Sequence, residues 1–235
     1  MENNHSLTLI MQRYGVDKHS YWPRLEPENI RVNPDFIATL VKLFDDHRIV
    51  TAGEFSSFHT GIIVDYIRKT HHFYLAKKLP EIEQNIELLI NSYNESLPLL
   101  LVLKKYFLEY QQHLSAHILN EENYLLPYIE YMLTLNKQEM HIAEYFYRSK
   151  EFSIQHFISN HDDTDGDLQK IYSAILEYVP TETNITPYRI LLSQLQLLEK
   201  DLNMHAFIEN HVLLPKALNM ENQFIKLFRK KVAMN

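Results

Sequence analysis

Cysteine is absent from this chain of 235 residues. Without thiols the chain can form no disulfide, and it cannot itself hold a metal through thiolates or carry an iron–sulfur cluster. Glycine is scarce, with four residues, and no segment alternates polar and apolar residues over the length of a typical strand. Leu, Ile, Glu, Gln and Lys, which favour helices, are abundant. The predicted fold class is therefore all-α.

An excess of positive charge is also absent. The chain has 23 basic and 30 acidic residues, a net charge of -7, and this balance argues against nucleic acid as a partner. No apolar run has the length of a membrane span, and the first residues lack the basic and apolar segments of a leader. We therefore expect a cytoplasmic protein without a membrane partner. Its oligomeric state does not follow from the sequence.

Two segments of the chain repeat one pattern, His-x3-Glu-x3-Leu-Leu-Pro. The first runs from His117 to Pro127 and the second from His205 to Pro215. On a helix, residues i and i+4 lie one above the other on the same face. Each segment therefore presents an imidazole and a carboxylate together.

Four histidines are almost evenly spaced along the chain. The interval is 45 residues from His72 to His117, then 44 to His161 and 44 to His205. This spacing predicts an up-down-up-down four-helix bundle with one histidine per helix, all in one layer. The bundle is expected in residues 53–235, after a small N-terminal helical unit in residues 1–52. The predicted bundle helices are 57–93, 99–134, 152–178 and 186–220, with a separate terminal helix at 222–234. The Leu-Leu-Pro prolines should end or kink their helices.

The candidate site is a pair of metal ions. A lone His-x3-Glu is more often a surface pair, but a repeat with the same apolar context favours buried ligands, because a buried carboxylate needs a compensating partner. Six ligands exceed the four of a tetrahedral zinc. They suit two non-haem irons, bridged by carboxylates and an oxo or hydroxo group. The predicted ligands are four terminal histidines and two bridging glutamates: His72, His117, His161, His205, Glu121 and Glu209. His71 is about 100° from His72 around the helix and is expected at the surface or behind the ligands.

The motifs resemble those of the hemerythrin-like domain in the repair-of-iron-centres (iron–sulfur cluster repair) family. Leu79-Pro80-Glu81 follows the first ligand histidine, and His161-Asp162-Asp163 matches the family's histidine before an acidic residue. The two His-x3-Glu segments match its other ligands. The resemblance implies a diiron protein of this family, with all six ligands retained. The family's N-terminal Cys-Cys pair is missing: after Arg13-Tyr14-Gly15-Val16-Asp17 the chain continues Lys18-His19.

By resemblance, the function is iron–sulfur cluster repair, or a response to nitrosative or oxidative stress. Its partners would be O2 or NO as a small ligand, and damaged iron–sulfur proteins. A hemerythrin-like sensor or store for O2 or NO, without turnover, is the alternative, and the missing cysteines favour it. A purely structural bundle with incidental histidines is a third possibility. The sequence does not decide whether the protein is an enzyme.

Overall fold

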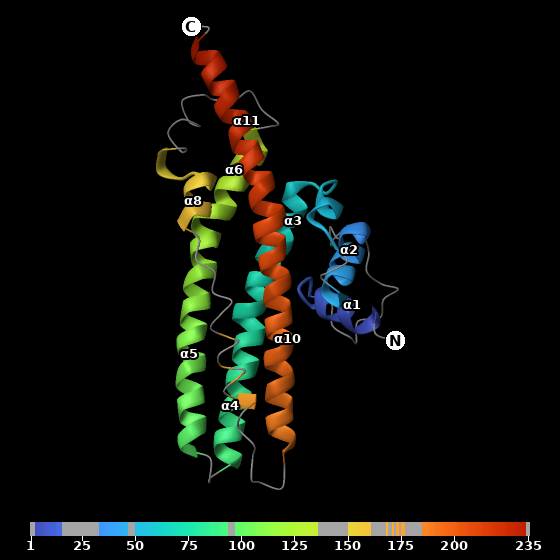
Figure 1. Ribbon diagram of the computed structural model, residues 1–235, viewed down its shortest axis with the longest axis vertical. Coiled ribbons are helices and arrows are strands. Elements are labelled where there is room, and N and C mark those ends of the chain that lie inside the picture. Colours follow the sequence, from blue (N-terminus) through green and yellow to red (C-terminus); the bar gives the residue numbers. More distant parts are fainter. Residues whose placement is uncertain are drawn as a thin grey trace. The chain divides into compact units, whose positions relative to one another are not determined.

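The computed structural model describes residues 3–15, 33–46, 50–93, 97–135, 150–160, 168, 171, 173, 175–176 and 185–233. Most of these residues are helical and none of them forms a strand, which confirms the all-α prediction. Three long helical runs make up most of the described residues (Figure 1). The first is α3 (Thr60–Phe73), η3 (Tyr74–Lys78) and α4 (Leu79–Ser92); the second is α5 (Leu97–Asn120), η4 (Glu121–Leu125) and α6 (Leu126–Leu135); the third is α10 (Thr186–Ile208), η5 (Glu209–Leu213) and α11 (Leu214–Ala233).

Each long run contains one π-helical turn, directly before a Leu-Pro pair. The amide of the Leu donates to the carbonyl five residues earlier, at Tyr74, Glu121 or Glu209. Proline has no amide proton, and its ring clashes with the carbonyl four residues back. A turn widened by one residue accommodates such a proline without ending the helix. Of the two outcomes expected for the Leu-Leu-Pro prolines, an end or a kink of the helix, the end does not occur, because α6 and α11 continue past Pro127 and Pro215.

The separate terminal helix that the sequence suggested is not present as a helix of its own, because the third run continues through it. Pro215 lies in the first turn of α11, and this helix continues without a break to Ala233. Asn222, the expected start of a new helix, is an interior residue of α11. The run that begins at Thr186 is therefore longer than predicted.

The chain divides into two compact units, the first of which combines Met1–Arg68, Leu119–Asp162 and Ala206–Asn235. Its N-terminal helices, α1 (Asn3–Gln12) and α2 (Pro34–Asp45), pack against each other, as the sequence predicted for short helices here. Asn33 caps α2, because its side chain accepts a hydrogen bond of 3.0 Å from the amide of Phe36. Phe36 in turn packs edge-on against three aromatic rings. These are Phe55, in the 3-10 turn η2 (Ala52–Phe55), Phe58 and Tyr66.

The second unit combines Lys69–Ile118 and Asp163–His205. In it α4, α5 and α10 lie side by side (Figure 1) around one apolar cluster. Buried side chains of the cluster recur at helical spacing, for example Leu103, Phe107 and Tyr110 on α5. Burial of such stripes stabilises the unit by about 25 cal/mol for each Å² of apolar surface removed from water. The cluster continues along α3 and α10 as far as Phe73 and Leu202.

The third predicted bundle helix is described only in part. Its first turns form α8 (Ile154–Asn160), which contacts α11. His161 lies outside the described residues, so its predicted place in the bundle layer stays a prediction. The domain boundary predicted at residues 52 and 53 also stays a prediction. Within the described residues, no helix is long and apolar enough to cross a membrane.

Candidate metal centre

His117 and Glu121 lie one turn apart on a single unbroken run. His117 is in the last turn of α5, and Glu121 is the first residue of the π-turn η4. The Glu121 side chain is fully buried, whereas His117 is partly exposed. The continuous helix therefore sets this imidazole and this carboxylate on one face, as the spacing predicted.

His205 and Glu209 repeat the arrangement on the third run. His205 lies in the last turn of α10, Glu209 begins the π-turn η5, and their exposed fractions are 6% and 2%. Burying a carboxylate without compensation costs several kcal/mol. Two such carboxylates, each with an imidazole one turn away on its own helix, form a donor set of the kind that binds metal ions.

His71, rather than His72, contacts His205. His71 is 1% exposed, and its Nε2 lies 3.4 Å from Nε2 of His205. The two rings are 5.0 Å apart between centroids and meet edge-on. His72 is exposed. The prediction of His72 as the ligand on this helix, with His71 outside the cluster, has the burial of the two residues reversed.

The physical reason is the direction of the apolar stripe along α3. Adjacent residues point about 100° apart on a helix, so only one of the two histidines can face the core. Val64 and Ile67 precede His71 by seven and four residues, and Tyr74 follows it by three; all are buried. This stripe is visible in the sequence. The helical periodicity of this stripe places His71, and not His72, on the buried face. The spacing between distant histidines cannot distinguish two adjacent residues.

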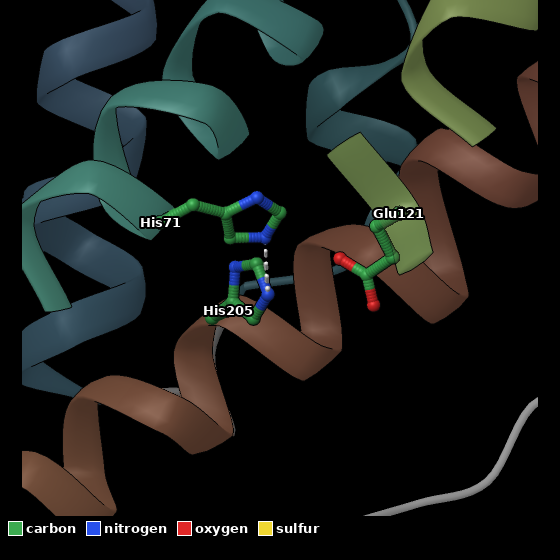
Figure 2. A group of neighbouring side chains, drawn as sticks. All are labelled: His71, Glu121 and His205. Carbon is green, nitrogen blue, oxygen red and sulfur yellow. Dashed lines mark hydrogen bonds between the residues drawn. The ribbon is translucent and has the colours of Figure 1, made fainter. Parts of the chain in front are cut away.

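Among the described residues, two groups of side chains could each hold a metal ion. One is His71, Glu121 and His205, drawn in Figure 2; the other is His117, Glu121 and Glu209. In each group, the ligand atoms are all within 4.8 Å of one another. Both groups include Glu121. Imidazole nitrogen with carboxylate oxygen suits iron, manganese or zinc, so the donor chemistry fits the predicted class of metal.

Of the six predicted ligands, these groups contain four: His117, Glu121, His205 and Glu209. His71 joins them in place of His72.

An ion-pair network supports the π-turn that begins at Glu121. Arg68 on α3 donates from Nε to Glu122, at 3.0 Å, and from Nη1 to Glu130 on α6, at 2.7 Å. Burial opposes the charge of the guanidinium, but the hydrogen bonds and charges of Glu130 and Glu122 outweigh it and raise the pKa of Arg68. Because the pair is partly exposed, its contribution to stability is modest, about 1 kcal/mol or less. It fixes the residue that directly follows Glu121.

Three curated relatives are similar to this chain, and each is named iron-sulfur cluster repair protein ScdA. Two come from strains of Staphylococcus epidermidis and are 23% identical over 155 residues, which is 66% of this chain and 65% of the relative. The third, from Staphylococcus haemolyticus, is 20% identical over 154 residues, with the same coverage. The match thus spans about 65% of each relative's length. No protein-family model matches the chain.

The fold and the donor groups define an all-α protein with His/Glu groups that could bind metal. The similarity to the ScdA proteins supports its assignment to the repair-of-iron-centres family, which the ligand motifs had indicated.

Proposed function

We propose that this protein binds two iron ions and acts in the repair of iron–sulfur clusters. The observation that carries the proposal is the pair of His/Glu groups with the buried carboxylate of Glu121 in common. A carboxylate has two oxygens and can serve two metal ions at once. The proposed ligands are His71, His117, His161, His205, Glu121 and Glu209. His161 belongs to this set through the sequence alone, by its spacing from the other histidines and by the family resemblance.

The roles of the side chains follow from their burial. Glu121 and Glu209, both buried, would neutralise the positive charge of the ions, and Glu121, which both groups contain, could serve both ions. The histidines would complete the coordination from separate helices. Iron held in this way supplies redox chemistry and a place for a small ligand such as O2 or NO. The protein's own part is to keep bulk water out and to hold the donors in position.

Damaged iron–sulfur proteins are the proposed partners in repair. This step comes from the names of the relatives, which are iron-sulfur cluster repair proteins. A second function is a hemerythrin-like sensor or store for O2 or NO. The lack of cysteine favours it, because the thiols that the family resemblance leads one to expect cannot take part in repair.

One experiment separates the two functions. The full chain is loaded with Fe(II) without oxygen, its iron is counted, and it is mixed with an enzyme whose iron–sulfur cluster nitric oxide has damaged. Recovery of that enzyme's activity, together with iron transfer, supports repair. Reversible binding of NO without recovery supports the sensor. A chain that retains no iron contradicts both.

The Glu121→Ala variant is the matched control for this experiment. It should show neither recovery nor gas binding, because it lacks the carboxylate common to both groups. Glu109→Ala, which removes an exposed carboxylate from α5, should behave as the unaltered chain does.

A further inference from the structure

Tyr74 occupies, in the first helical run, the position that a candidate ligand occupies in the other two. The three π-turns begin at Tyr74, Glu121 and Glu209, each five residues before the Leu of a Leu-Pro pair. Their exposed fractions are 0%, 0% and 2%. Short π-helical turns inside α-helices occur frequently at functional sites. Two of the three first residues are candidate metal ligands, and the third is a phenol.

Tyr74 also contacts a candidate ligand directly. Its ring lies 5.9 Å from the ring of His205 between centroids, at an interplanar angle of 82°, an edge-on contact within the second unit. His71 makes the other edge-on contact with His205, at 5.0 Å. Since His71 and Tyr74 are three residues apart on one run, one helix face supplies both rings. The imidazole of His205 therefore contacts two rings from the same helix face.

We propose that Tyr74 is a positioning residue of the metal centre, whose ring fixes the orientation of the His205 imidazole. This inference rests on the proposed function, because it assigns His205 as a ligand. Edge-on aromatic pairs stabilise a structure by more than the burial of their apolar area alone. A side chain that orients a ligand histidine affects metal affinity about 10- to 100-fold when it is replaced. The contact between Tyr74 and His205 is one between their rings, so the inference assigns the positioning role to the ring of Tyr74.

The test compares three variants with the unaltered full chain. Tyr74→Leu removes the ring, Tyr74→Phe keeps it, and Tyr93→Leu is the matched control. Tyr93 is almost as deeply buried in the same apolar cluster but lies about five helical turns further along the run. Each protein is titrated with Fe(II) without oxygen. The melting temperature of the metal-free form reports the cost of the substitution to the fold.

We expect Tyr74→Leu to weaken iron binding about tenfold or more. The iron affinity of Tyr74→Phe should stay within about twofold of that of the unaltered chain, because phenylalanine retains the ring. Tyr93→Leu should lower the melting temperature without weakening iron binding beyond its effect on stability. Equal iron affinities in Tyr74→Leu and Tyr93→Leu would overturn the inference. So would a loss in Tyr74→Phe as large as that in Tyr74→Leu, because the hydroxyl would then be the active group.

A metal-free measurement separates this inference from the proposed function. The imidazole signals of His205 in the NMR spectrum of the metal-free chain should change in Tyr74→Leu and be kept in Tyr74→Phe. Unchanged signals in Tyr74→Leu would overturn the inference even if the chain binds iron. Failure of the unaltered chain to bind iron would instead refute the proposed function and, with it, the role of Tyr74 toward a metal.

Discussion

The first helical run and the two His-x3-Glu runs solve one structural problem with different side chains. All three have a Leu-Pro pair and a π-turn in front of it. Counted back from that Leu, the His-x3-Glu runs place glutamate at the fifth residue and histidine at the ninth. The first run places Tyr74 at the fifth, Thr70 at the ninth and its buried histidine, His71, at the eighth. The three runs thus share the π-turn before the Leu-Pro pair, but the first run differs in the positions of its candidate ligands.

The two kinds of run therefore position their candidate ligands differently. In the second and third runs the carboxylate itself begins the π-turn, so backbone and donor are coupled. In the first run the histidine precedes the turn and lies on the buried stripe of α3. Its position depends on the packing of that stripe.

The largest effect is expected from removing the carboxylate common to both groups. Glu121→Ala should lose nearly all bound iron, since both groups of ligand atoms include this side chain. Glu209→Ala, which belongs to one group, should lose less. Metal analysis after anaerobic loading measures both, and Glu109→Ala is the exposed control. Iron contents that are equal in all three variants would refute the assignment of the carboxylates.

The next prediction tests the first run against the other two. His71→Ala should reduce iron binding by about tenfold or more, whereas His72→Ala should have almost no effect. The two variants have the same composition and differ by one position on the same helix. His71 is buried beside His205, and His72 is exposed. If His72→Ala lost the iron and His71→Ala kept it, the spacing of the histidines would be a better guide than the packing of α3.

The third prediction concerns stability. Removal of the metal should lower the free energy of unfolding by on the order of a few kcal/mol, when the metal concentration is well above its dissociation constant. The metal-free chain would retain buried carboxylates whose negative charge the ions no longer offset, beside imidazoles that no ion binds. Thermal unfolding with and without a chelator measures the change. It should be large for the unaltered chain and small for Glu121→Ala. A melting temperature that chelation leaves unchanged in the unaltered chain would contradict a buried metal centre.

Much of this arrangement could be predicted from the sequence, because it depends on local rules. The helical pattern and the two His-x3-Glu faces follow from spacing along one helix. The choice between His71 and His72 could not be made by counting between distant histidines, since a shift of one residue rotates a side chain by about 100°. The π-turns in front of the prolines were also not predicted. A proline inside a helical pattern can end a helix, kink it or induce a wider turn, and only the surrounding packing decides among these.

The smallest effect is expected where the shared π-turn is itself weakened. Pro127→Ala restores an amide proton and removes the ring that clashes with the carbonyl four residues back, so an ordinary α-turn can compete with the π-turn η4. In an α-turn Glu121 would rotate relative to α6, and iron should bind several-fold more weakly. The π-turn already accommodates the proline, so stability should change by only about 1 kcal/mol or less. Pro98→Ala is the matched control, because Pro98 lies in the first turn of α5, where proline is tolerated.

Pro80→Ala should weaken iron binding less than Pro127→Ala, because the first run places Tyr74, not a carboxylate, at the start of its π-turn. Equal losses at Pro80 and Pro127 would mean that the wide turn holds the imidazole of the first run as firmly as it holds the carboxylate of the second.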